Sequence, residues 1–239
     1  MAADRNTQTQ LSLLGGLEFR HAGKCISIPI AGQRLLAFLA LHDWHQHRSV
    51  IAGTLWTDVC DERAAARLRT ALWRIRRAGA GLVHSEGPYL RIDRGIRVDL
   101  TDLVGATRRL VADPFAAGEP PVTAAMLGLD LLPQWHDDWV VIERERLRQL
   151  RLHGLEALCR RLSTQGRHAA AIDAGIRAVQ IEPLRETGQR VLIAAHLGDG
   201  NVAEAVRQYR SFRGQLSEHL GIEPGPEIRA LFRQACAAV

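Results

Sequence analysis

Apolar residues change their spacing along this chain near residue 30. Before that point they gather in short β-leaning runs, separated by Gly15-Gly16 and by the polar residues 21–24. Short runs of this kind between turn residues predict a small antiparallel meander. The expected strands cover residues 11–14, 17–20 and 25–30.

From residue 33 the apolar residues return at helical spacing instead. This pattern predicts a buried first helix over residues 33–42. A second helix is expected over residues 50–56, because Ser49 is a residue type that caps helices. Leu55 and Trp56 would then face inward.

A third helix is expected over residues 61–77, and its two faces differ. At 100° per residue Leu68, Leu72 and Ile75 form a narrow apolar stripe. The acidic residues stop at the first turn, where they suit the helix dipole. An arc of roughly 80° on the other side is positive along its length, which favours a polyanion over plain solvation. The arc consists of Arg63, Arg67, Thr70, Arg74 and Arg77.

Two short apolar runs follow, at residues 82–84 and 89–92, on either side of the turn sequence Ser-Glu-Gly-Pro. They predict a hairpin, and residues 96–98 predict one more strand. The order of strands, three helices and a hairpin is that of a winged helix. In that fold the third helix enters the major groove of DNA and the hairpin, or wing, touches the flanking backbone.

Beyond residue 100 the pattern is helical with short breaks. Thr101 and Thr123 are expected to cap helices that end near residues 112 and 131. A long helix is expected from residue 137 or 138 onward. Its first residues predicted to face a core are Trp139, Val140 and Ile142.

An internal repeat lies in this second half. Four residues recur with a period of 34, which is the period of tetratricopeptide helix pairs. The repeated glycine allows a tight turn, and the repeated alanine lets two helices approach closely. The pairs are Leu158 with Leu192, Gly166 with Gly200, Ala171 with Ala205, and Ile172 with Val206.

The net charge differs between the part of the chain before residue 100 and the part after it. Residues 1–100 hold 14 Lys and Arg against 9 Asp and Glu, whereas residues 101–239 hold 17 of each. The net charge of +5 therefore falls on the first part alone. We expect two domains, in which residues 1–100 bind a polyanion and residues 101–239 bind neither polyanion nor membrane.

Other chemistry is sparse. The four cysteines lack the spacing of a zinc site or a disulfide framework. His42, His45 and His47 have no further ligand set at closed-site spacing, so no metal is expected. The chain contains no phosphate-binding loop, and with no convergent catalytic set neither a cofactor nor an enzyme is expected. Without a leader or a long apolar run, a cytoplasmic, nucleoid-associated protein is expected.

Several segments, in the right order, resemble the DNA-binding domain of the Streptomyces antibiotic regulatory protein family. They are LLGGLEFR, QRLLAFLALH, TLW, ARLRTALWRIRRA, and GPYLRID with RVDL. Pro88 departs from the family pattern, which more often has Gly next to Tyr. Three later segments resemble the bacterial transcriptional activation domain of the same regulators. They are LLPQWHDDWVVIERERLR, GRHAAAIDAGIRAVQIEPLRE and LGIEPGPEIRALFRQA.

The resemblance implies a mainly α fold with a small β part. A winged helix-turn-helix of the response-regulator (OmpR) type would be followed by an all-α array of three tetratricopeptide-like pairs. In this array Pro226 would open the last helix, since proline suits a first helical turn.

The expected function is a sequence-specific transcriptional activator that binds double-stranded DNA. The arc Arg63, Arg67, Thr70, Arg74 and Arg77 would read the major groove. The DNA backbone would be met by Arg48, Tyr89, Arg91 and Arg94. The resemblance implies two protomers head to tail on direct repeats, recruitment of RNA polymerase holoenzyme including its sigma subunit, and control of an antibiotic gene cluster. Two alternatives stay open: a tetratricopeptide-type interaction regulator whose basic helix is only solvated, and a repressor with the same DNA-binding fold.

Overall fold

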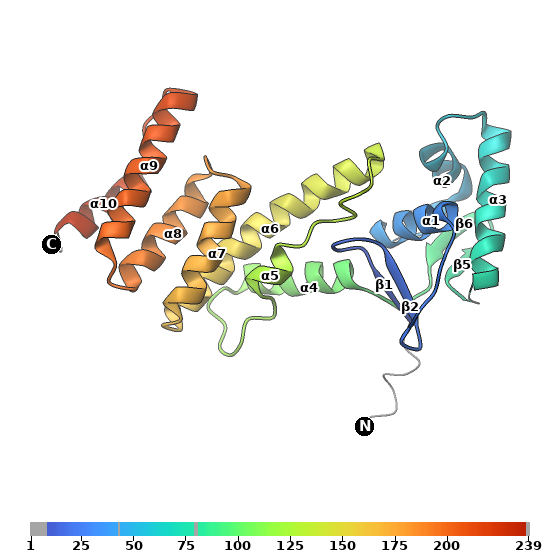
Figure 1. Ribbon diagram of the computed structural model, residues 1–239, viewed down its shortest axis with the longest axis horizontal. Coiled ribbons are helices and arrows are strands. Elements are labelled where there is room, and N and C mark those ends of the chain that lie inside the picture. Colours follow the sequence, from blue (N-terminus) through green and yellow to red (C-terminus); the bar gives the residue numbers. More distant parts are fainter. Residues whose placement is uncertain (1–8, 43, 79–80, 238–239) are drawn as a thin grey trace. The chain divides into compact units, whose positions relative to one another are not determined.

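A computed structural model describes residues 9–42, 44–78 and 81–237 (Figure 1). The chain forms two compact units. The first comprises Met1–Asp102 and Asp130–Arg144, and the second comprises Leu103–Leu129 and Glu145–Val239. The fold is mainly helical with small sheets near the N-terminus, as the sequence predicts.

The first sheet has the strand order β3-β2-β1-β7. Its strands are β1 (Thr9–Ser12), β2 (Glu18–His21), β3 (Lys24–Cys25) and β7 (Ile96–Val98). The predicted antiparallel meander is confirmed, with Leu11 opposite Phe19 and both buried. The third strand, expected over residues 25–30, ends at Cys25, and helix α1 begins at Ile30. Strand β7 adds to β1 in parallel, a pairing that the sequence did not predict.

Three helices and a second sheet complete a winged helix. The helices are α1 (Ile30–Leu41), α2 (Arg48–Leu55) and α3 (Asp61–Ala78). The hairpin of β5 (Val83–Glu86) and β6 (Tyr89–Ile92) is joined at its edge by β4 (Gln46–His47), a strand that the sequence did not predict.

The cap of α2 is His47, so the prediction of Ser49 as the cap is wrong. Strand β4 leaves His47 in the extended conformation that a capping residue adopts. Its ring nitrogen Nδ1 accepts the N–H of Ser49 at 3.3 Å. Leu55 and Trp56 are buried, as predicted.

Part of the first unit's core comes from a segment that the sequence assigned to the second half. Leu131 forms an isolated bridge with Leu14, and the N–H of Leu132 donates to the carbonyl of Leu13 at 2.9 Å. The ring of Trp139 meets Phe38 edge-on, with 5.5 Å between ring centroids. Residues 130–144 therefore complete the fold of the first unit.

Trp139 and Val140, at the start of α6 (Asp138–Thr164), are buried as predicted. Ile142 is 58% exposed, so its prediction as a core residue is wrong. At 100° per residue Ile142 lies about 160° from Val140, which places it on the opposite side of the helix.

The second unit contains stacked helices. Besides α4 (Asp99–Ala112) and α5 (Ala124–Leu127), these are α6, α7 (His168–Ile181), α8 (Glu186–Gly198), α9 (Val202–Leu220) and α10 (Pro226–Ala237). Thr123 caps α5 by accepting the N–H of Met126 at 3.3 Å, and Pro226 opens α10, as predicted.

The repeat of 34 residues corresponds to helix pairs, α6 with α7 and α8 with α9. Gly166 and Gly200 turn between the helices with φ of +70° and +75°, values that favour glycine. A methyl group at Gly175 would lie 3.1 Å from the Cα of Leu192, so α7 and α8 need a small residue there. In the described residues α10 follows these two pairs as a single helix.

The cysteines provide a simple test of this packing. Cys25, Cys60 and Cys236 are exposed, whereas Cys159 is buried, and burial raises the pKa of its thiol to about 12. We expect a thiol reagent at neutral pH to label the three exposed cysteines rapidly and Cys159 only after denaturant is added. Mass spectrometry of labelled peptides would measure this, and rapid labelling of Cys159 would contradict the packing of α6 against α8.

Candidate nucleic-acid interface

Helix α3 is amphipathic in the way its sequence predicts. Leu68, Leu72 and Ile75 are buried, and the helix packs against α1 and α2. Its approach to α1 is close, because a methyl group at Gly32 would lie 3.1 Å from Cγ1 of Ile75. The buried face thus fixes which side of α3 is presented outward.

The outer face of α3 is exposed and basic. All five predicted residues are exposed, and two flanking arginines extend the same charge. No acidic residue follows Glu62 in this helix. The exposed set comprises Arg63, Arg67, Arg69, Thr70, Arg74, Arg76 and Arg77.

One arginine of this face has an acidic partner. Nη1 of Arg67 donates to both carboxylate oxygens of Asp58, each at 2.9 Å, and this contact lowers the pKa of the Asp58 carboxyl. Both side chains are exposed, so the pair is open to competition from another anion. The Nε and Nη2 groups of Arg67 take no part in the contact and could still form a two-bond contact with phosphate or guanine. Thr70 donates its hydroxyl to the carbonyl of Ala66 at 3.1 Å.

Trp73 is a member of this surface that the sequence analysis missed. It is 56% exposed, and the guanidinium of Arg77 lies 4.9 Å from its ring centroid. This is a cation–π contact. On the helical wheel Trp73 falls beside Arg77 on the polar side, and this position is the sequence signal for its place on the surface.

Hydrogen bonds join the hairpin to α2 and to the segment before it. Arg48 donates through Nη2 to Ser85 of β5 at 2.8 Å, and its backbone N–H donates to the carbonyl of Pro88 at 2.9 Å. Pro88 thus fits the two-residue turn, with Gly87 at φ +56°. Arg91 donates to Nε2 of His45 at 3.2 Å. These contacts fix the hairpin beside α2.

Two further predicted wing residues are exposed. The ring of Tyr89 is 44% exposed and stands edge-on to His47, with centroids 5.3 Å apart. Arg94 is exposed in the turn after β6. Both are therefore accessible to a partner.

The histidines near this surface have local roles. His42 bonds the carbonyl of Phe38 through Nδ1 at 2.7 Å, and His47 caps α2. Within residues 9–42, 44–78 and 81–237, no group of three or more His, Cys, Asp or Glu is placed to hold a metal ion. In the same ranges no helix has both the length and the apolarity of a bilayer span.

The described structure thus combines a winged helix that carries an exposed arginine face with stacked helix pairs. Residues 124–235 match the family described as the bacterial transcriptional activator domain. The chain is also 28% identical to the regulatory protein AfsR of Streptomyces coelicolor over 242 residues and to AfsR of Streptomyces griseus over 236 residues.

Each AfsR alignment covers 93% of this chain and 24% of the relative, so the chain spans about a quarter of the length of the curated relatives it matches. Among solved structures, Mycobacterium tuberculosis EmbR in complex with a low affinity phosphopeptide has the same fold. That match has a TM-score of 0.78 at 20% identity and covers 97% of this chain and 65% of EmbR. Residues 124–235 thus match a bacterial transcriptional activator domain, and the chain is similar to the AfsR proteins over most of its own length.

Proposed function

We propose that this chain is a transcriptional activator that binds specific sequences in double-stranded DNA. The observation that carries the proposal is the outer face of α3, which is exposed, rich in arginine and free of acidic residues past its first turn, while its inner face is buried. The family match and the AfsR homology support this assignment.

In this proposal the residues have two kinds of role. Base edges are read from α3, and phosphate contacts position the protein on the duplex. The base-reading set is Arg63, Arg67, Thr70, Arg74 and Arg77. The backbone set is Arg48, Tyr89, Arg91 and Arg94. We also propose that the first unit binds DNA and that the second serves activation.

The proposal extends to assembly and target. Two protomers would bind direct repeats head to tail near a promoter, and the helical array would recruit RNA polymerase with its sigma subunit. Resemblance to antibiotic regulatory proteins supports a secondary-metabolite gene cluster as the target. Transcription in vitro with purified polymerase holoenzyme tests the sign of regulation, because a repressor would lower the transcript level.

DNA binding is tested by footprinting on fragments from the chain's own genomic neighbourhood, together with mobility shifts over a series of salt concentrations. We expect two adjacent protected repeats and an affinity that falls steeply with salt. If no fragment is retarded even at low salt, the interaction-regulator alternative is favoured instead.

Replacing Arg74 by alanine, or Arg67 by alanine, is expected to weaken binding to the cognate site by about 1–3 kcal/mol if the side chain contacts a base. Binding to random DNA should change less. The matched control is Arg69→Ala, which removes the same charge from the flank of the same helix. Equal losses on both DNAs would move the tested arginine to the phosphate-contact class.

Replacing Asp58 by asparagine should have the opposite effect on random DNA. The change removes a negative charge beside the basic face and the carboxylate that holds Arg67. We expect random DNA to bind several-fold more tightly while the cognate site gains less, so that specificity falls. Glu62→Gln is the control, since it makes the same charge change on α3. An equal change of specificity in both variants would show that Asp58 acts only through its charge.

A further inference from the structure

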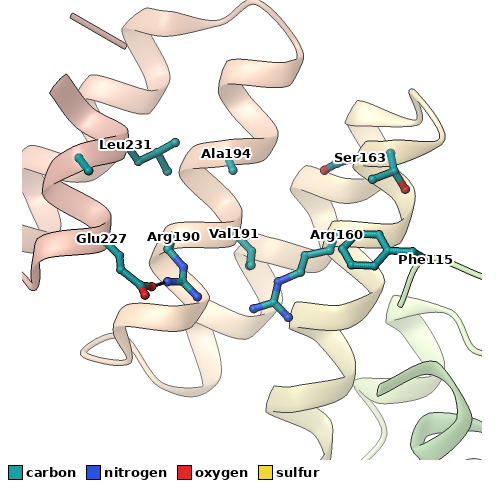
Figure 2. A pocket seen from close by; sticks show the side chains of 10 residues that line it. Phe115, Arg160, Ser163, Arg190, Val191, Ala194, Glu227 and Leu231 are labelled. Atoms are coloured by element: carbon teal, nitrogen blue, oxygen red, sulfur yellow. Dashed lines mark ion pairs between the residues drawn. The ribbon is translucent and has the colours of Figure 1, made fainter. Parts of the chain in front are cut away.

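A groove in the second unit has a chemical character unlike that of the arginine face. It has a volume of about 570 Å³, and its lining comes from α6, α8, α10 and one residue of the loop after α4 (Figure 2). Sites for ligands are typically on the order of 300–1,000 Å³. Helices α6 and α8 are the first members of successive pairs, and stacked repeats commonly bind partners on such a shared face.

Phe115 stands at the edge of this groove with 66% of its surface exposed. Its loop is nevertheless fixed, because the buried Arg161 donates to the carbonyls of Ala117 and Gly118 at 3.0 and 3.1 Å. Gln165 donates to the same Gly118 carbonyl at 2.8 Å. An uncovered aromatic ring on a loop that is held by hydrogen bonds, beside an apolar groove, indicates a surface that receives an apolar group.

The groove also carries an excess of positive charge. Val191, Ala194 and Leu231 contribute apolar surface. Arg190 is paired with Glu227 across the groove (Figure 2). Arg160 is half-buried and has no carboxylate partner in the part of the chain that the structure describes. A guanidinium beside apolar walls is more favourable with a counterion than without one.

We propose that this groove binds an extended acidic peptide segment of a partner protein. A bulky apolar side chain of the segment would pack between Phe115 and Val191, and a neighbouring Asp or Glu would pair with Arg160. A peptide suits the site better than a compact metabolite because Phe115 and Leu231 lie at opposite ends of the groove (Figure 2). The inference does not depend on DNA binding, and its test needs no DNA.

The probe is a fluorescein-labelled, terminally blocked peptide, Gly-Asp-Phe-Leu-Asp-Gly, titrated with the full-length protein and followed by fluorescence anisotropy. One control peptide has asparagine in place of both aspartates, and another has alanine in place of both apolar residues. We expect each control to bind about tenfold or more weakly than the parent peptide. If the parent peptide does not bind at about 1 mM protein, the proposal is overturned.

Protein variants test whether the peptide binds in this groove. Arg160→Glu should weaken it by about tenfold or more, and Phe115→Ala, which changes an exposed residue, should weaken it several-fold. Arg210→Glu makes the same charge change on the exposed side of α9, outside the groove, and should leave binding nearly unchanged. Thermal melts confirm that each variant is folded.

Two further results would overturn the proposal. Equal weakening by Arg160→Glu and Arg210→Glu would show attraction through overall charge alone. Displacement of the peptide by phenylacetate at a similar concentration would show that the groove prefers a small organic acid.

Discussion

Replacing Trp139 by alanine is expected to destabilise the first unit by about 3–5 kcal/mol, the usual range for truncating a buried Trp. Trp139 is 9% exposed and packs edge-on against Phe38 of α1. Leu132 and Val140, in the same segment, are fully buried. Because α1 also supports α3, the loss should reach the arginine face of α3 although Trp139 lies far along the chain from it.

The matched control is Trp139→Phe. It keeps an aromatic ring beside Phe38 and removes the indole N–H, which is buried without a hydrogen-bond partner in the described structure. We expect this variant to lose much less stability than the alanine variant. Denaturant unfolding followed by circular dichroism, with DNA mobility shifts in parallel, measures both effects. Near-wild-type stability of Trp139→Ala would contradict the assignment of residues 130–144 to the first unit.

The same segment shows which kind of structural feature could not be predicted from the sequence. The bounds of helix α3 were predicted to within one residue, because the spacing of its apolar residues follows the helical period of 3.6 residues. The hairpin and the glycine turns of the repeat were likewise local signals. No local pattern shows that residues 130–144 pack in the first unit, because the residues that they contact lie more than 100 positions away in the sequence.

Asp99 illustrates the same limit at one residue. Asp99 lies next to the predicted division between residues 1–100 and 101–239. In the structure its carboxylate accepts the N–H groups of Leu13 at 2.9 Å and Leu14 at 3.2 Å, and so ties β1 to the start of α4. Burial raises the pKa of this carboxyl. A side chain that binds backbone groups 85 and 86 residues away cannot be predicted from residue propensities or from spacing.

For the candidate site, the sequence predicted which residues lie on the exposed face of α3 but not which residues their side chains contact. A helical wheel gives the direction of each side chain, and the exposed arc of α3 follows from it. The wheel does not contain the loop before α3, so the pairing of Arg67 with Asp58 could not be foreseen. The wheel does place Trp73 on the polar side next to Arg77, so the exposure of this residue could have been predicted. In the structure Asp58 and Trp73 both lie at the candidate interface on α3.

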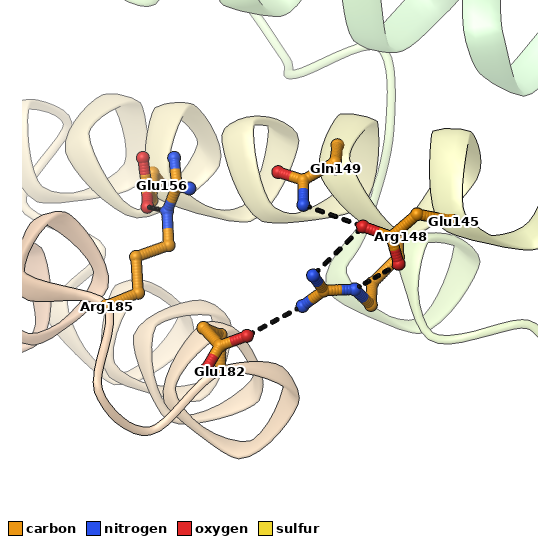
Figure 3. Close-up of polar contacts among 6 residues, drawn as sticks. All are labelled: Glu145, Arg148, Gln149, Glu156, Glu182 and Arg185. Carbon is orange, nitrogen blue, oxygen red and sulfur yellow. Dashed lines mark hydrogen bonds and ion pairs between the residues drawn. The ribbon is translucent and has the colours of Figure 1, made fainter.

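Replacing Glu156 by alanine is the second large effect expected, and it concerns the helical array. Glu156 lies on α6 and its side chain is 5% exposed (Figure 3). Its Oε1 accepts from Nε of Arg185 at 2.7 Å and from the hydroxyl of Thr187 at 2.6 Å. These two donors lie at the start of α8, so one carboxylate joins the first helices of successive pairs.

Removing one partner of a buried ion pair typically costs about 3–5 kcal/mol, because the remaining charge is left without compensation. Arg185 is 24% exposed, so water can partly solvate it, and we expect the lower part of that range. Glu156→Gln keeps the shape and an acceptor for Thr187 and should lie between the wild type and alanine. Urea unfolding of the second unit, followed by circular dichroism, measures the series.

Helix α6 also carries a control, an arginine whose ion pairs have the same chemistry as that of Glu156 but are more exposed. Arg148 donates to Glu145 of its own helix and to Glu182 after α7, both through contacts of 2.8 Å (Figure 3). These side chains are 33–56% exposed, so solvent screens the contacts and compensates for their loss. We therefore expect Glu182→Ala to shift the unfolding midpoint far less than Glu156→Ala. Equal shifts would mean that burial does not set the strength of these contacts and that the carboxylate of Glu156 is not what holds α8 against α6.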